Sequence, residues 1–158
     1  VGIETWIRHF REEHNDYKAL LLEALADRLS EAFAEYLHLL VRKALWGYAP
    51  DENLSLHDLF HTGYQGIRPA PGYPACPEHS EKETLLNLLE AHQAGITLTE
   101  HYAMYPNASV CGQFYAHPGA SYFGVGKVAP DQVEDYARRK GVSPAFVEKF
   151  IPENLSYK

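Results

Sequence analysis

Residues 17–46 read YKALLLEALADRLSEAFAEYLHLLVRKALW and contain neither glycine nor proline. Large apolar side chains recur there at steps of three and four residues, the spacing of one face of an α-helix: Leu22, Leu25, Leu29, Phe33, Tyr36 and Leu40. The pattern predicts one long helix that ends near Gly47. It makes the first half of the chain predominantly helical.

A loop rich in proline and glycine follows this helical half. Ser55 and Asp58 have the spacing of a capping box, which predicts a short helix over about 55–61. Residues 63–77 then hold three glycines and four prolines in fifteen positions. Neither a helix nor a central strand tolerates that composition, so we expect a structured loop or an edge extension.

The second half of the chain shows mixed signals. Ser80 and Glu83 form a second capping-box pattern, which predicts a helix that ends near Gly95. Runs rich in β-branched and aromatic residues predict strands, at 96–99, 109–115 and 122–128. Pro130 opens a helix that should stop at Gly141, and Ser143 has the chemistry of an N-cap for a last short helix. The predicted fold class is α+β, with helices packed with a small antiparallel sheet in one unit.

Composition limits the classes of function. The 158 residues are 46% hydrophobic, enough for a substantial core. The net charge is −7, from 14 basic and 21 acidic residues without a basic stripe, so we expect no nucleic-acid partner. No apolar run has the length of a bilayer span, and we expect no membrane association. With two cysteines, a cytoplasmic location is the simplest expectation.

The proline-rich loop carries the first candidate chemistry. Its prolines fix the backbone, and Gly66 and Gly72 permit a close approach to it. Arg68 offers a planar set of donors to a carboxylate or phosphate, and Tyr73 offers a flat ring with a hydroxyl. The residues alone equally allow a stiff surface connector in which Arg68 pairs with a nearby acid.

Two acidic residues share a face of the long helix. Asp27 and Glu31 are four positions apart and lie roughly opposite the stripe of Leu25, Leu29 and Phe33. From the residues alone, a solvated acidic face is the better interpretation.

The loop sequence GIRPAPGYPACP, residues 66–77, contains Arg68-x-x-x-Gly72-Tyr73 and resembles the S-adenosylmethionine-binding signature of the methionine synthase activation domain family. Further segments resemble the family in the same order: 48–50, 98–100, 108–110, 117–118, 122–123, 125–127 and 131–137. The resemblance covers nearly the whole chain. It implies that residues 1–158 are the C-terminal part of this activation, or reactivation, domain.

The resemblance also implies roles for residues of the loop. Arg68 would bind the carboxylate of S-adenosylmethionine, and the backbone around Pro69 and Ala70 would meet the adenine. Gly72 and Tyr73 would complete this part of the binding site. A backbone stiffened by proline suits this task, because few long side chains have to be ordered.

Two further segments receive roles from the resemblance. Tyr122 and Phe123 match the family's second contact segment, although ordinary strand packing explains at least one of them equally well. Asp27 and Glu31 would face the ligand and the cobalamin-binding module, which reverses the interpretation from the residues alone. Their negative charge would favour the sulfonium cation.

The activity implied by the family is the repair of a methyltransferase. S-adenosylmethionine would methylate a cob(II)alamin held by the neighbouring cobalamin-binding domain, after an electron arrives from flavodoxin or a flavoprotein reductase. Positioning suffices for such a transfer, and we expect no acid-base catalytic residue. The family's N-terminal half supplies part of the site, so this chain alone would bind weakly or not at all. The alternative is a non-catalytic, stand-alone module that docks on a corrinoid protein or a flavoprotein.

A metal site is the remaining alternative. His57 and His61 have helical spacing, Cys76 and His79 form a C-x-x-H pattern, and Cys111 lies downstream. We do not expect zinc here, because a second paired-cysteine element is missing and the C-x-x-H lies within the family loop. Zinc is expected only elsewhere in a full-length enzyme of this family.

Overall fold

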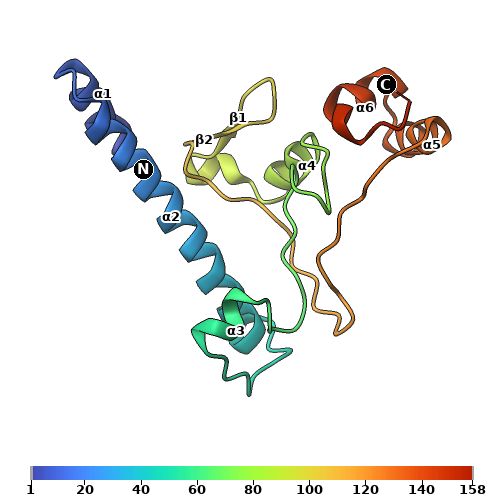
Figure 1. The fold of residues 1–158 in the computed structure, drawn as a ribbon, viewed down its shortest axis with the longest axis horizontal. Helices are drawn as coiled ribbons and strands as arrows, with labels where there is room; N and C mark the ends of the chain where they lie inside the picture. The colour runs from blue at the N-terminus through green and yellow to red at the C-terminus, as the bar shows by residue number, and fades with distance from the viewer. Residues whose placement is uncertain (1, 158) are drawn as a thin grey trace.

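The computed structural model describes residues 2–157 and is rich in helix (Figure 1). The α-helices are α1 (Ile3–Glu12), α2 (Asp16–Leu40), α3 (Leu56–Phe60), α4 (Glu81–Leu88), α5 (Pro130–Lys140) and α6 (Pro144–Phe150). Three shorter helical turns are η1 (Val41–Leu45), η2 (Ala91–Ala94) and η3 (Pro152–Asn154), and the strands are β1 (Thr97–Leu98) and β2 (Met104–Tyr105). The α+β class with a small antiparallel sheet is confirmed.

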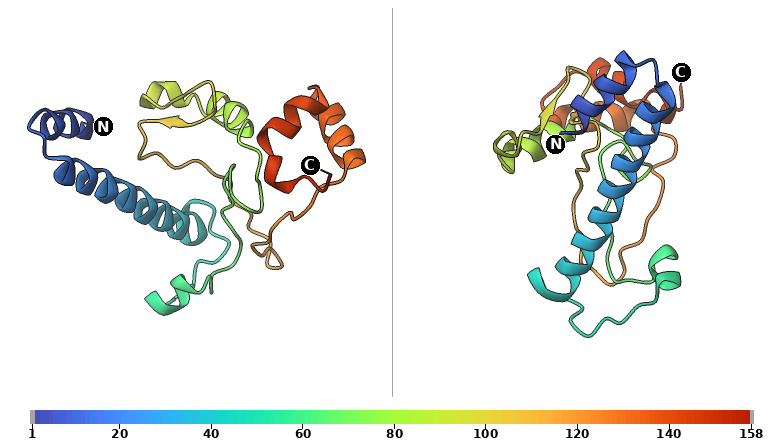
Figure 2. Two further views of the ribbon diagram at one scale, coloured as in Figure 1. Left: turned by 45° about the horizontal axis from the view of Figure 1, so that its top comes forward. Right: turned by 90° about the vertical axis from the view of Figure 1, so that its left-hand side faces the viewer.

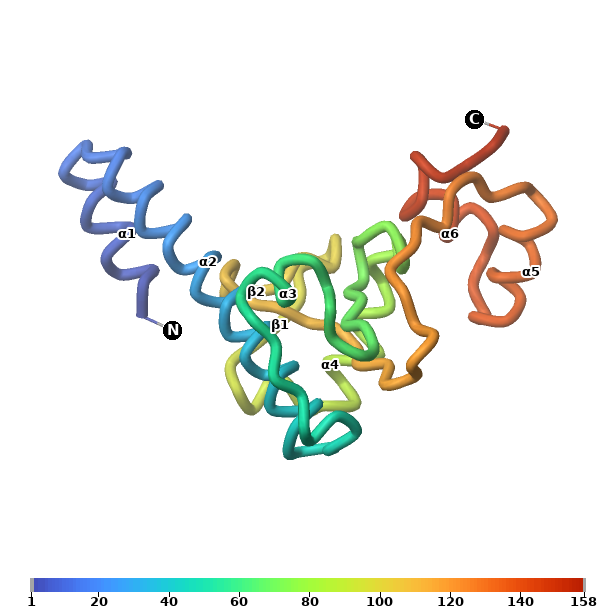
Figure 3. The backbone as a smooth tube through the Cα atoms, turned by 60° about the horizontal axis from the view of Figure 1, so that its bottom comes forward, coloured from blue at the N-terminus to red at the C-terminus, as the bar shows by residue number. Residues whose placement is uncertain are grey.

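The predicted long helix is confirmed as α2 and its π-helical continuation η1. Asn15 caps the start of α2, since its Oδ1 accepts a hydrogen bond from Lys18 N at 3.2 Å. Helix α1 folds back along α2, and Arg11 Nη2 donates to Glu23 Oε1 at 2.7 Å. Together α1 and α2 form an arm that projects from the rest of the molecule (Figures 2 and 3).

Two of the three predicted strands are wrong. In the described residues the sheet is β1 paired with β2, with Thr97 opposite Tyr105 and Leu98 opposite Met104. Segments 109–115 and 122–128 make only isolated bridges, Ile67 with Tyr115 and Val128 with Leu155. Their side chains favour strands, but three glycines, Gly112, Gly124 and Gly126, interrupt them, and a strand also requires a continuous partner.

The predicted helix from Ser80 to Gly95 is shorter than expected. Helix α4 ends at Leu88, and Glu90 takes a left-handed conformation with φ 50° before η2. Ser80 does not cap α4, because its Oγ accepts a hydrogen bond from Lys140 Nζ at 2.6 Å. The hydrogen bond from Lys140 has therefore replaced the local capping bond of Ser80.

The other capping predictions are confirmed. Ser55 and Asp58 exchange hydrogen bonds, from Asp58 N to Ser55 Oγ at 3.2 Å and from Ser55 N to Asp58 Oδ2 at 2.9 Å. Ser143 Oγ accepts a hydrogen bond from Phe146 N at 3.2 Å and so starts α6. Helix α5 starts at Pro130 and stops at a left-handed Gly141, as predicted.

The main apolar core lies at the C-terminal end of the chain. Helices α5 and α6 and the segment after η3 bury one cluster: Val133, Ala137, Val147, Ile151 and Leu155. The apolar stripe of α2 does not contribute to it, because the side chains of Leu25, Leu29 and Phe33 are 53%, 71% and 63% exposed. Helix α2 instead meets the rest of the chain near its C-terminal end, where His38 and Arg42 are fully buried.

None of the helices in residues 2–157 combines the length and the apolar character that a membrane span requires.

Candidate functional site

The proline-rich loop is fixed by backbone pairing with residues 113–115. Ile67 N donates to Tyr115 O at 3.0 Å, and Tyr115 N donates back to Ile67 O at 2.9 Å. Gln113 N donates to Pro69 O at 3.0 Å. The backbone of 67–69 is therefore held in an extended shape without belonging to a regular sheet.

Two glycines of this loop are required by the fold. Gly66 has φ +84°, and a Cβ there would lie 2.3 Å from Tyr115 O. Gly72 has φ +100°, and a Cβ there would lie 2.3 Å from the His79 ring. Both positions combine a left-handed backbone with a close approach that only glycine allows.

A tight turn presents Tyr73 to solvent. Tyr73 N donates to Ala70 O at 3.2 Å, and Cys76 N donates to Tyr73 O at 2.8 Å. Gly72 N closes the turn on Cys76 O at 2.7 Å. The Tyr73 side chain is 63% exposed, so its ring is available to a bound molecule.

Arg68 points from the loop toward α2. Its Nη2 donates to Glu35 Oε2, and its Nη1 donates to His38 Nδ1 at 3.1 Å and to Tyr64 Oη at 3.2 Å. Burial alone would lower the pKa of Arg68, but the bond to Glu35 raises it above the usual range. Arginine has five N–H donors, and the Nε–H and one Nη2–H of Arg68 have no acceptor among residues 2–157.

His38 is the buried partner that fixes the Arg68 side chain. Its ring stacks on Phe114 with centroids 5.0 Å apart, and its Nε2 lies 3.1 Å from Tyr48 Oη. Burial, with the charges of Arg42 and Arg68, lowers the pKa of His38 to about 4. The neutral ring accepts from Arg68 at Nδ1, so Nε2 carries the proton and donates to Tyr48.

A second ion pair, between Arg42 and Glu52, lies beside Tyr64. Arg42 is fully buried, and its Nε and Nη2 donate to the Glu52 carboxylate at 2.8–3.0 Å. The Arg42 guanidinium carbon lies 4.5 Å from the centroid of the Tyr64 ring. The Arg68 guanidinium carbon lies 5.5 Å from the centroid of the same ring, so Tyr64 contacts two cations.

The predicted second segment lies against the loop. Tyr122 Oη accepts a hydrogen bond from Arg68 N at 2.9 Å and lies 3.4 Å from Tyr64 Oη. Val125 N donates to Pro74 O at 2.9 Å, and the Phe123 side chain is 59% exposed. The fold thus brings Tyr122 to Arg68 and leaves the Phe123 ring open to solvent.

Asp27 and Glu31 are not in contact with the loop. Both are exposed, and Glu31 pairs with Arg28 at 2.9 Å. On α2, Asp27 lies about two turns before Glu35, and Glu31 lies about one turn before it. Residues four apart share a helix face, so all three carboxylates lie on one side of α2. The acidic face therefore leads along α2 to Arg68, but Glu35 is the acid that meets the guanidinium.

Sequence reasoning missed the three residues that hold Arg68, namely Glu35, His38 and Tyr64. Glu35 and His38 follow Glu31 at helical steps of four and seven, which places them on its face of the helix, but this spacing does not say that the face meets the loop. Tyr64 precedes Arg68 by four residues in a loop, where spacing carries no such signal.

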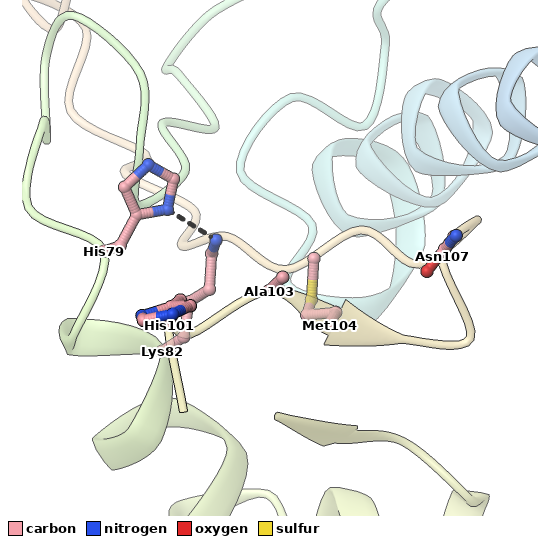
Figure 4. Close-up of a pocket in the computed structure, with 6 residues that line it drawn as sticks. All are labelled: His79, Lys82, His101, Ala103, Met104 and Asn107. Atoms are coloured by element: carbon pink, nitrogen blue, oxygen red, sulfur yellow. Dashed lines mark hydrogen bonds between the residues drawn. The ribbon is translucent and has the colours of Figure 1, made fainter. Parts of the chain in front are cut away.

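A hollow of about 400 Å³ lies beside the loop, and Figure 4 shows its walls. It is lined by His79, Lys82, His101, Ala103, Met104 and Asn107. Within residues 2–157, no cluster of three or more His, Cys, Asp or Glu side chains could hold a metal ion. Burial raises the pKa of the Cys76 and Cys111 thiols, which disfavours thiolate chemistry at either residue.

Two comparisons with known proteins bear on the fold. Residues 1–141 match the family model described as vitamin B12 dependent methionine synthase, activation domain. A crystal structure of the MetH reactivation domain bound to AdoHcy superposes with a TM-score of 0.94 at 54% sequence identity. The match covers 98% of this chain and 48% of that chain, so the chain spans about half the length of this relative.

Proposed function

Because the chain belongs to the family of vitamin B12 dependent methionine synthase activation domains, we propose that it binds S-adenosylmethionine at the Arg68 loop. There it presents the methyl group to a cobalamin held by a neighbouring domain of the same enzyme. The observation that carries this proposal is the 54% identity, over 98% of the chain, to a reactivation domain bound to AdoHcy.

The polar groups around Arg68 fit an amino-acid end of a ligand. The two N–H donors of Arg68 without a protein acceptor suit a carboxylate. Glu35 Oε1 is buried and has no hydrogen-bond partner among the described residues. A buried acceptor without a partner is costly, and a ligand ammonium group would satisfy it.

The rest of the loop suits a nucleoside. The extended backbone of Pro69 and Ala70 offers groups to the edge of adenine, and backbone pairing fixes it in advance. The exposed rings of Tyr73 and Phe123 provide flat apolar contact.

The role of this chain in the reaction is to position the methyl donor. Cobalamin, when bound by its own domain, supplies the reduced cobalt that takes up the methyl group. The loop orients the donor, and Asp27 and Glu31 place negative charge along α2, which favours a sulfonium cation. We further propose that flavodoxin or a flavoprotein reductase supplies the electron and that the enzyme works in the cytoplasm.

Replacement of Arg68 tests the proposal. In the full-length protein, Arg68→Ala should weaken S-adenosylmethionine binding in isothermal titration calorimetry by roughly 10- to 100-fold, the range for lost charged hydrogen bonds. Arg68→Lys should recover only part of the affinity, because lysine lacks the planar set of donors. The matched control is Arg139→Ala, which removes an exposed arginine of α5.

Arg68 also contributes to the fold, so near-ultraviolet circular dichroism has to show that the variants remain folded. Unchanged affinity in a folded Arg68→Ala variant would contradict the proposal.

A further inference from the structure

Lys82 is a buried cation without an acidic partner. Its side chain lies in the first turn of α4, and the residue is 7% exposed. Its Nζ donates to His79 Nδ1 at 2.9 Å (Figure 4). It also donates to Tyr102 O at 3.2 Å. An ammonium group has three donors, and the third has no acceptor among residues 2–157.

No neighbouring group of the described chain supplies the missing negative charge. The buried acid Glu78 is already paired with Lys140. Cys111 lies near Lys82, but burial raises the pKa of its thiol, which therefore stays neutral at physiological pH. Buried charges in proteins are normally paired, because an unpaired charge has lost its hydration without compensation.

The hollow beside Lys82 has the composition of an anion site. Its lining combines Lys82 with the donors of His79, His101 and Asn107, and it contains no carboxylate. Ala103 and Met104 give it a short apolar wall on the side of β2. The acid at the rim is Glu100, which is 87% exposed and lies 3.8 Å from His101 Nε2.

We propose that this hollow is a second ligand site, in which Lys82 Nζ binds the carboxylate or phosphate group of a small organic anion. The charged group of the ligand would accept a hydrogen bond from the third ammonium donor of Lys82, and Asn107 lines the far end of the hollow, beyond Met104 (Figure 4). The volume of about 400 Å³ leaves room for an organic body beyond the charged group.

The site is distinct from the Arg68 loop, although the two share a wall. His79 accepts from Lys82 at Nδ1, and its ring fills the space above Gly72. Burial lowers the pKa of Lys82, and a bound anion would raise it again. The inference rests on Lys82 and its surroundings, and it stands or falls independently of S-adenosylmethionine binding.

Met104 provides a probe inside the hollow, because it is the only methionine of the 158 residues. Full-length protein labelled with ¹³C at methionine methyl groups can be titrated with inorganic phosphate and, separately, with acetate, at an ionic strength kept constant with chloride. The Met104 signal is assigned from its loss in Met104→Leu. We expect a saturable shift of this signal with at least one of the two anions.

Three variants decide the outcome. Lys82→Gln and Asn107→Asp should each weaken the saturable shift at least tenfold, and Lys149→Gln, which changes an exposed lysine of α6, should leave it unchanged. Asn107→Asp keeps the buried lysine and so separates repulsion of the anion from loss of folding. A shift that stays linear, or one that persists in both Lys82→Gln and Asn107→Asp, would overturn the proposal.

Discussion

Arg68 is held by side chains from two different parts of the chain. Glu35 and His38 come from α2, and Tyr64 comes from the start of the loop. Such an arrangement fixes the guanidinium before a ligand arrives, which lowers the ordering cost of binding. Arg68 pairs with an acid, which the residues alone allowed, and it still has N–H donors without an acceptor among residues 2–157.

His38 is expected to remain neutral far below the usual histidine pKa. Its folded pKa of about 4 lies below the ordinary value of 6.5. The unfolded chain therefore binds more protons between these values, and stability is complete above pH 6.5 and falls as the pH drops toward 4. The shift corresponds to a loss of about 3 kcal/mol in the free energy of unfolding.

Nuclear magnetic resonance titration of the His38 ring checks this prediction directly. The exposed His101 serves as the internal comparison for assignment through His101→Gln. A His38 midpoint near 6.5 would show that its ring is neither buried nor bonded to Arg68 as described.

At the level of single residues, the sequence led to the candidate loop but not to the residues that hold Arg68. Arg68, Gly72 and Tyr122 are marked by a local motif and by a family resemblance. Glu35 and His38 are ordinary helix residues until the loop is placed against α2. Which helix face meets a loop depends on tertiary packing, and spacing along one element does not encode it.

Among the secondary-structure elements and loops, the backbone pairing of the proline-rich loop with residues 113–115 holds the candidate site in place. We predict that Gly66→Ala destabilises the protein by on the order of 3 kcal/mol, because a left-handed backbone is strained and the Cβ meets Tyr115 O. Gly126→Ala is the matched control: it has φ +72° but nothing within 4 Å, so it should cost only about 1 kcal/mol. Urea denaturation measures both values, and equal losses would contradict the close approach.

The two predicted strands that the structure lacks have a physical explanation. Segment 109–115 has strand-forming side chains, but its Tyr115 pairs with the proline-rich loop at a single bridge. The prolines at 69 and 71 have no N–H to donate, so the ladder cannot continue along the loop. Strand propensity therefore predicted the extended backbone correctly and the sheet wrongly.

At the scale of the whole molecule, Lys140 links α5 to the segment before α4. It pairs with the buried Glu78 and donates to Glu81 Oε1 at 2.8 Å, and Tyr136 Oη donates to the same oxygen at 2.6 Å. We predict that Lys140→Met lowers the free energy of unfolding by about 3 kcal/mol, because Glu78 is left as a buried charge without its cation. Thermal or urea unfolding measures this loss.

The control for this prediction is Lys149→Met in α6, which should change stability by less than about 0.5 kcal/mol. Adding Glu78→Gln to Lys140→Met should restore part of the loss, since no unpaired charge remains. If Lys140→Met and Lys149→Met have equal stability, the contacts of Lys140 between α5 and α4 do not stabilise the fold.

The exposed face of α2 is the other feature at this scale. Leu25, Leu29 and Phe33 belong to the apolar stripe of this helix, yet more than half of each residue is exposed. Helical periodicity predicts that a face is apolar, and it does not say which part of a protein covers it. The chain spans about half of the related reactivation domain, and its own core lies between α5 and α6.

A crystal structure of the full-length protein with S-adenosylhomocysteine would show whether the loop around Arg68 binds the ligand. We predict that the ligand lies at the loop of residues 66–77, with its carboxylate on Arg68 Nε and Nη2 and its ammonium group on Glu35 Oε1. A ligand bound elsewhere, or one bound at this loop without a contact to Arg68, would contradict it.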